Sequence, residues 1–311
     1  MKNISKIILC DTLSHPTPIL LEWSYGLIDL GYETLYLPIP QHSVTEIDEP
    51  ADVLVYAGIP ADDYHLQQFL QFKNKFPDCK IIGATDQWRA GYEQFKNVVD
   101  FFIMTQHENN SLVKSFNDNG FKLYSVPLAG NHRLFHKISK PELYDASFIG
   151  NLTHGYRGED KFLYPILDNN NYNCFLGGIS YGRYQNGFLP YDQHNDIRNS
   201  TKINLNFHVP YQKPNKGDDL DRVDLNQSVF NIALSGNFQL CDHPLVHDIF
   251  KGTIPIGNEE NWLELFEYYL HQPDLRYEMA FHAKLIAEQQ HTWIVRMKEF
   301  IEIVNKHFLE I

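Results

Sequence analysis

The chain has 311 residues, of which 43% are hydrophobic and 21% charged; this composition excludes a disordered protein, and the length predicts two globular domains. The formal net charge of −13 opposes non-specific binding to nucleic acid or anionic lipid, because such binding needs clustered lysine and arginine. A local basic cleft stays open as an alternative, although no run of basic residues is longer than two.

The N-terminal sequence and the cysteines bear on where the protein works. The first apolar run is too short for a signal peptide, and no stretch of about 18 apolar residues predicts a membrane-spanning helix. The four cysteines are far apart and match no metal or redox spacing. Buried thiols in a reducing compartment are expected, which predicts a cytoplasmic protein. The cysteines are Cys10, Cys79, Cys174 and Cys241.

Residues 1–135 are expected to form a Rossmann-like domain, because compact apolar strands alternate with amphipathic helices. Such alternation is typical of a parallel sheet that is covered on both faces. The expected strands are 6–10, 34–39, 52–58, 80–86, 99–106 and 122–129, and the expected helices are 18–32, 62–76 and 108–121.

A second alternating series follows a polar stretch, 130–145, whose proline and lysine content is typical of a linker. It predicts a second Rossmann-like domain over 136–290 and a closing helix over 291–311 that packs back on the first domain. The fold class is therefore α/β, with two domains facing a cleft. The expected strands are 146–151, 172–178, 202–208, 238–241 and 252–257, and the expected helices are 157–170, 223–234, 259–272 and 273–290.

Several ordered motifs of the second half resemble one enzyme family. The chain is similar to glycosyltransferases of the GT-B type, and within them to the spore-maturation-protein-like group of the "glycosyl transferases group 1" class. The resemblance covers residues 144 to about 300, whereas the first half matches only in pattern. It rests on YDASFIGN (144–151) with Arg157, KINLNFH (202–208), LNQSVFNIALSGNFQLCD (225–242), ENWLELFEYYLHQPDLRYEMA (260–280) and HTWIVRM (291–297).

The resemblance implies sugar transfer from a nucleotide-activated donor, with a UDP-sugar favoured, to a hydroxyl acceptor. The donor is a co-substrate, and no further cofactor is implied. The second domain would hold the donor, and the first would present the acceptor and a base. The acceptor class stays open between a glycan, a lipid-linked glycan, a protein and a modified nucleobase, and the acidic balance of the chain disfavours nucleic acid.

The predicted donor site combines small residues at turns with one arginine. Backbone N–H groups of Ser235, Gly236 and Asn237 are expected to approach the diphosphate, because glycine permits close contact. Arg157 offers a bidentate grip on phosphate. The alternative for the Ser235–Gly236 turn is an ordinary helix C-cap. The full set of expected donor-binding residues is Gly150, Asn151, Arg157, Gly177, Asn204, Asn226, Asn231, Ser235, Gly236 and Asn237.

Two positions depart from the family pattern. Asn231 stands where the family usually has a glutamate that takes ribose hydroxyls, and Ser228 stands where it usually has an arginine. Loss of that cation favours a changed donor, lost activity, or compensation by another basic residue. A non-catalytic nucleotide-sugar or glycan-binding protein is therefore the alternative function. The compensating candidates are Arg157, Arg183, Lys202 and Lys216.

The catalytic candidates follow strands of the first half. Asp11 and His15 follow the first strand and Asp86 the fourth, and each could take the proton of an acceptor hydroxyl. An equally weighted alternative for the two aspartates is helix capping. His291–Trp293 is expected to cap and anchor the last helix rather than to catalyse.

Two further classes of site are disfavoured. Asp219 and Asp221 have the spacing of a metal-binding pair, but their polar context is typical of a solvated loop, so no metal is predicted. The loop after the first strand reads DTLSHP and lacks G-x-G-x-x-G. The lack of this motif argues against a dinucleotide-dependent oxidoreductase.

Overall fold

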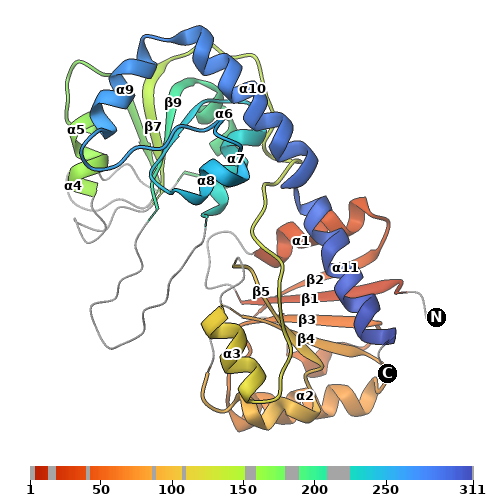
Figure 1. Cartoon of the computed structure of the whole chain (residues 1–311). Helices are drawn as coiled ribbons and strands as arrows, with labels where there is room; N and C mark the ends of the chain where they lie inside the picture. Colours follow the sequence, from red (N-terminus) through yellow and green to blue (C-terminus); the bar gives the residue numbers. More distant parts are fainter. Residues whose placement is uncertain are drawn as a thin grey trace. The chain divides into compact units, whose positions relative to one another are not determined.

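The computed structural model describes residues 4–12, 19–39, 43–85, 89–106, 110–150, 159–178, 189–208 and 225–309. The chain divides into two compact units (Figure 1). Unit 1 contains the described residues up to Leu128 and those from Trp293 on, whereas unit 2 contains those between Ala129 and Thr292. Each unit is built on a parallel sheet with helices, which confirms the predicted α/β class.

Unit 1 has a six-stranded sheet in the order β2-β1-β3-β4-β5-β6. Because β1 lies between β2 and β3, the strand order reverses there, and this reversal marks the place where open α/β sheets bind ligands. The strands are β1 (Lys6–Thr12), β2 (Glu33–Ile39), β3 (Val53–Ala57), β4 (Lys80–Ala84), β5 (Phe101–Met104) and β6 (Leu123–Ser125).

The helices of unit 1 cover a core rich in aromatic rings. Phe102 is fully buried, and its ring lies 4.9 Å from that of Phe116 and 5.0 Å from that of Tyr92. The helices are α1 (Ile19–Asp29), α2 (Asp63–Lys75), α3 (Asn110–Asp118) and α11 (Trp293–Leu309), with 3-10 turns η1 (Val44–Glu46) and η2 (Tyr92–Asn97).

The last helix, α11, packs on α1 within unit 1 (Figure 1). The indole N–H of Trp293 donates to the buried carboxylate of Glu22 at 2.7 Å. Gly26 permits the close approach, since a Cβ at that position would lie 2.6 Å from the Trp293 carbonyl oxygen. Trp293 therefore anchors the start of α11 by both packing and a charge-assisted hydrogen bond.

Unit 2 has a four-stranded sheet in the order β10-β9-β7-β8. The strands are β7 (Tyr144–Ile149), β8 (Cys174–Gly177), β9 (Thr201–Asn206) and β10 (Gln239–Cys241). The helices are α4 (Glu159–Phe162), α5 (Tyr164–Leu167), α6 (His194–Asn199), α7 (Gln227–Leu234), α8 (Leu245–Ile249), α9 (Trp262–Leu270) and α10 (Pro273–Gln290), with a 3-10 turn η4 (Tyr191–Gln193).

Three features of unit 2 differ from the sequence pattern. The strand expected over 252–257 is wrong, because this segment makes only one bridge, between Ile256 and Cys241. Pro255 explains the difference in part, since proline has no N–H for a sheet ladder. The described part of the helix expected over 157–170 is two short helices, α4 and α5. The polar helix α6 had no apolar periodicity and was not expected.

The helices were also searched for a membrane span. Among those in the described part of the chain, none combines the length and the apolar character that a bilayer crossing requires.

Candidate functional site

The carboxyl ends of β7 and β8 in unit 2 meet closely. The Gly150 N–H donates to the Gly177 carbonyl at 3.0 Å. Gly178 follows with φ +113°, and a Cβ there would lie 2.3 Å from the Gly150 carbonyl oxygen. Glycine is therefore required here for a left-handed backbone and for close approach of two chain segments. Gly150 and Gly177, both predicted donor-binding residues, thus lie at the sheet edge where parallel sheets bind ligands.

The helix α7 begins at the same edge. Asn226 is its N-cap, and its side chain accepts from the Val229 N–H at 3.2 Å. The amide of Asn226 also donates to Asn206 Oδ1 at 2.8 Å and to the Phe207 carbonyl at 3.3 Å. Asn206 in turn donates to Gln239 Oε1 at 3.2 Å. A buried polar network therefore fixes the first turn of α7 to the ends of β9 and β10.

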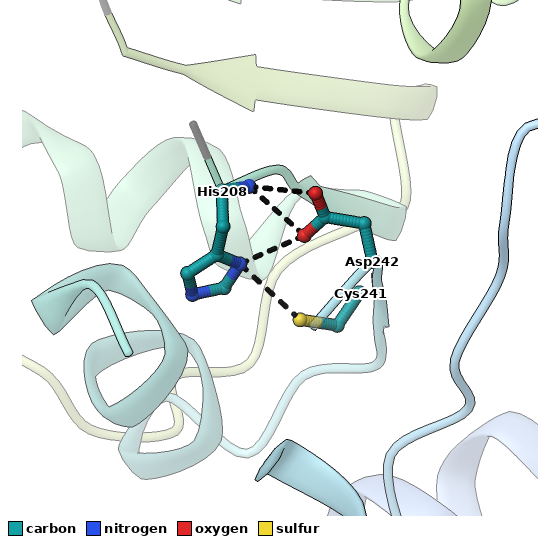
Figure 2. Close-up of side chains that lie close together, drawn as sticks. All are labelled: His208, Cys241 and Asp242. Carbon is teal, nitrogen blue, oxygen red and sulfur yellow. Dashed lines mark hydrogen bonds and ion pairs between the residues drawn. The ribbon is translucent and has the colours of Figure 1, made fainter. Parts of the chain in front are cut away.

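Three side chains at or just after the carboxyl ends of β9 and β10 converge beside this turn (Figure 2). His208 Nδ1 lies 2.8 Å from Asp242 Oδ1, and the His208 backbone N–H donates to both Asp242 oxygens at 2.9 and 3.0 Å. Cys241 Sγ lies 3.7 Å from the same Nδ1. His208 is buried, and within the described part of the chain its Nε2 atom has no hydrogen-bond partner.

This His208–Asp242 pair has a definite chemical capacity. In the neutral ring, Asp242 selects the tautomer with the proton on Nδ1, so that Nε2 carries the lone pair and can accept a proton or a hydrogen bond. The three groups are close enough to hold a metal ion, with ligand atoms within 4.8 Å of one another. Nδ1 is already bonded to the carboxylate, however, and burial raises the pKa of the Cys241 thiol. The arrangement is therefore that of a hydrogen-bonded pair with a neutral thiol beside it.

A buried arginine contacts the first turn of α7. Arg198, on α6, donates from Nη2 to Ser228 Oγ at 3.3 Å. Its guanidinium carbon lies 4.8 Å from the centre of the Phe135 ring. Burial lowers the pKa of Arg198 to about 10, which still leaves the group charged at neutral pH. The sequence singled out Ser228 but not Arg198.

The predicted turn Ser235–Asn237 lies at the opposite end of α7, its C-terminus. The Ser235 N–H donates to the Asn231 carbonyl at 3.1 Å, and the Gly236 N–H donates to the Ala233 carbonyl at 2.8 Å. Gly236 has φ +63°, the left-handed conformation of a helix C-cap. These N–H groups are therefore taken up by the helix, and the expectation that they bind a diphosphate does not fit. The C-terminal end of a helix dipole also disfavours an anion.

The side chains of this turn have protein partners as well. Ser235 is fully buried, and its hydroxyl lies 2.8 Å from Asn195 Oδ1. Asn237 Oδ1 accepts from Lys137 Nζ at 2.6 Å, whereas its buried Nδ2 finds no partner among the described residues. The alternative reading of Ser235–Gly236 as a helix C-cap describes what the turn does in the structure.

Two more of the predicted donor residues are occupied by hydrogen bonds within the fold. Asn231 Oδ1 accepts from the Asn131 N–H at 2.9 Å, and its Nδ2 donates to the Tyr191 hydroxyl at 3.1 Å. Asn204 accepts from the Ser147 hydroxyl and donates to the Phe238 carbonyl, at 3.1 and 3.2 Å. Both amides are buried, so a ligand contact at either would have to replace a bond that the fold already makes.

In unit 1, Asp11 is buried at the end of β1, and its carboxylate accepts from the Leu20 N–H at the start of α1 at 3.0 Å. The capping alternative therefore describes its position, and its catalytic role stays a prediction.

In unit 2, Lys202 pairs with Asp145 at 2.7 Å and so is not a free cation beside Ser228. The predicted residues that lie outside the described ones are His15, Asp86, Asn151, Arg157, Arg183, Lys216, Asp219 and Asp221.

Arg198, His208 and Asp242 are not among the residues that the sequence predicted for the site. The two latter residues did carry a signal, because they close the motifs KINLNFH and FQLCD at the ends of two predicted strands. Arg198 carried none, because it lies in a polar segment, and only folding brings it to Ser228.

The two parallel-sheet units agree with the two-domain fold that the sequence predicted. Residues 157–302 match the family model described as "Glycosyl transferase-like", which confirms the resemblance seen in the sequence motifs. A comparison of the sequence with curated proteins gives no match.

Solved structures support the same fold over the whole length. Sucrose-phosphate synthase from Thermosynechococcus elongatus is 7% identical, with 99% of this chain and 100% of that chain covered and a TM-score of 0.63. HepE from Anabaena, solved with UDP-glucose, is 10% identical, with coverage of 97% and 99% and a TM-score of 0.60. AviGT4, a glycosyltransferase involved in avilamycin A biosynthesis, is 11% identical, with 99% of each chain covered and a TM-score of 0.62. The chain therefore has the GT-B fold.

Proposed function

We propose that the protein is a glycosyltransferase that moves a sugar from a nucleotide-activated donor, with a UDP-sugar favoured, to a hydroxyl acceptor. The observation that carries the proposal is the ligand edge of unit 2, where the first turn of α7 lies beside the ends of β9 and β10. This edge belongs to the segment that matches the glycosyl transferase-like family. A structural neighbour of the same fold was solved with UDP-glucose, which favours uridine as the base.

The reaction determines what the edge must do. The bond between the anomeric carbon and the phosphate oxygen breaks, and the diphosphate leaves with its negative charge. The first turn of a helix offers N–H groups and the positive end of a dipole to such an anion. Preorganised donors of this kind stabilise the developing charge without reorganisation in the transition state.

The acceptor hydroxyl must lose its proton to a base. Asp11 remains our candidate in unit 1, where it lies beside the reversal point of the strand order. In unit 2, the hydrogen bond between His208 Nδ1 and Asp242 makes Nε2 the acceptor atom of the neutral ring. We propose that His208 accepts a hydrogen bond from a hydroxyl of the bound donor. The base that takes the acceptor proton is then Asp11 of unit 1.

We further propose that transfer needs no metal and no other cofactor, because the charge of the leaving diphosphate can be met by the helix end and by arginine. The four cysteines are free thiols, which supports a reducing, cytoplasmic location. The acceptor is a glycan, a lipid-linked glycan, a protein or a modified nucleobase, and the net charge of −13 disfavours nucleic acid.

One observation favours a second candidate, a non-catalytic nucleotide-sugar or glycan-binding protein. Asn231, the predicted ribose contact, uses both ends of its amide within the fold. A site that has lost one donor contact could keep binding while losing transfer.

Binding and turnover on one panel of donors separate the two candidates. We expect a UDP-sugar to raise the melting temperature, by the equivalent of about 2.7 kcal/mol at a concentration one hundred times its dissociation constant. Release of the nucleoside diphosphate, by hydrolysis or transfer, should persist in EDTA. Binding without release across all donors and acceptors would support the second candidate. Absence of any shift across uridine, guanosine, adenosine and thymidine sugar nucleotides would contradict both sugar transfer and nucleotide-sugar binding, and would leave only glycan binding.

A further inference from the structure

Arg198 is a buried cation that has no counter-ion among the described residues. The residue is only 3% exposed, and its buried Nη1 has no hydrogen-bond partner among the residues that the structure describes. The other contacts are Nη2 to Ser228 Oγ and the ring of Phe135, neither of which is charged. Within the described part of the chain, no carboxylate pairs with this guanidinium. A buried charge of this kind destabilises a fold unless something pairs with it.

Another buried arginine of the same unit, Arg276, has both hydrogen-bond and ion-pair partners. Arg276 is also 3% exposed, and its Nη1 donates to the carbonyls of Tyr269 and Leu270, both at 2.8 Å. Its Nη2 lies 3.4 Å from the carboxylate of Glu142. The fold can therefore satisfy an interior arginine completely. Compared with Arg276, Arg198 lacks an anionic partner among the described residues.

The surroundings of Arg198 suit an anion. Ser228 is the second residue of α7, whose eight residues begin after the N-cap Asn226. The Val229 N–H of the first turn is already bonded to the Asn226 side chain, but this end of the helix still carries the positive end of the dipole. The hydrogen bond between Arg198 and Ser228 brings the guanidinium to this turn. Two independent sources of positive potential thus meet at one place.

We propose that Arg198 and the first turn of α7 form an anion site that binds the diphosphate of the nucleotide-activated donor. The inference rests on the proposed function for the identity of the anion. A guanidinium binds two phosphate oxygens side by side through its planar fork, and Ser228 Oγ fixes the orientation of that fork. Because Nη1 is buried, an anion reaches it only when neighbouring side chains move, so binding is coupled to a local rearrangement.

Calorimetric titration of the full chain with inorganic pyrophosphate, UDP and uridine tests the site. We expect Arg198→Met to weaken pyrophosphate and UDP binding by tenfold or more, which is a common cost of losing a charged hydrogen bond. Uridine has no phosphate, so its affinity should change less than about twofold. The double variant R198M/S228R, which returns a cation to the same turn from α7, should recover part of the lost affinity. Arg276→Met is the matched control and should leave all three affinities of the folded protein unchanged.

A second measurement separates an anion-binding arginine from a structural one. Without ligand, Arg198→Met should melt at the same temperature as the unmodified protein or higher, because it removes an unpaired buried charge. Arg276→Met should melt lower, because it removes the hydrogen bonds to the Tyr269 and Leu270 carbonyls and the ion pair with Glu142. If Arg198→Met does not fold, Arg198→Lys keeps the charge without the fork, and a loss of pyrophosphate affinity in that variant supports the site.

The outcomes also separate this site from the proposed function. Unchanged pyrophosphate and UDP affinity in folded Arg198→Met overturns the site, even where the unmodified protein transfers sugar. Arg198-dependent pyrophosphate binding in a protein that binds no nucleotide sugar supports the anion site and overturns the proposed donor.

Discussion

The two ends of α7 are separated by only eight residues, but one end suits an anionic ligand and the other does not. At the N-terminal end, Asn226 caps the helix, and Arg198 brings an unpaired charge to Ser228. At the C-terminal end, the N–H groups of Ser235 and Gly236 are already bonded to helix carbonyls. The sequence motif placed the diphosphate at the second end, whereas helix physics favours the first. A small-residue turn therefore indicates an anion site only when the direction of the adjoining helix is known.

The largest effect should follow loss of the cap at the N-terminal end. Asn226→Ala removes the bond to the Val229 N–H and leaves Asn206 Oδ1 without the donor that it now has. Loss of a cap costs about 1 kcal/mol and a buried unsatisfied acceptor about 1–3 kcal/mol, so we expect the free energy of unfolding to fall by about 3 kcal/mol. Chemical denaturation measures the change.

Asn226→Ser is the control, because serine keeps the cap and loses the amide. It should recover about 1 kcal/mol of the loss. Equal losses in both variants would mean that the cap contributes nothing and that the network to β9 alone fixes the start of α7.

The second prediction concerns the pKa of His194, which lies on the same helix as Arg198 and is affected by its charge. Burial, followed by the charge of Arg198, lowers the pKa of His194 to about 4. The unfolded chain binds this proton near pH 6.5 and the folded chain only near pH 4, so stability is present above pH 6.5 and is lost as the pH falls toward 4. With allowance for the partial exposure of His194, we expect a loss of about 2 kcal/mol over this range.

Denaturation curves between pH 7 and pH 4 measure this slope. His194→Gln should flatten it, because the substituted side chain does not titrate. Arg198→Met should make it shallower, because one of the two causes of the low pKa is removed. A slope unchanged by Arg198→Met would mean that desolvation alone lowers the pKa of His194.

The sequence predicted the fold well because apolar periodicity is a local property. Ten strands of the structure overlap strands that were expected, and the three closing helices α9, α10 and α11 were expected too. The failures occur where local pattern carries no information. The polar segment that forms α6 shows no apolar face, and the segment 252–257 is apolar enough for a strand but contains Pro255.

The candidate site was predicted less completely, because its properties come from pairing in three dimensions. Because Ser228 replaces the family's usual arginine, the sequence predicted that a cation is missing at this position. Arg198 lies thirty residues earlier in the chain, and nothing in the sequence indicates that its Nη2 atom lies 3.3 Å from Ser228 Oγ. Likewise, Asn231 and Asn204 have the side-chain chemistry of ligand contacts, and only the structure reveals that their amides already have partners. Residue type identifies a candidate group, but the bonds that it already makes determine whether it is available.

The smallest effect should come from the C-terminal end of α7 and completes the comparison. Gly236→Ala places a side chain at φ +63°, which costs about 1 kcal/mol for a residue other than glycine. The new Cβ would lie 3.1 Å from Lys284 Cδ and 3.3 Å from Lys137 Cδ, but both are flexible chains that can move. We therefore expect a loss of about 1 kcal/mol in denaturation and no change in affinity for UDP or pyrophosphate.

Gly252→Ala is the matched control for the backbone cost of Gly236→Ala. Gly252 has φ +75°, and the nearest atom to an added Cβ is His247 Nε2 at 3.4 Å. The two variants should lose similar stability, because both pay mainly for the left-handed backbone. A large loss of UDP affinity in Gly236→Ala, with Gly252→Ala unchanged, would return the diphosphate to the C-terminal turn and reverse the assignment made from the two helix ends.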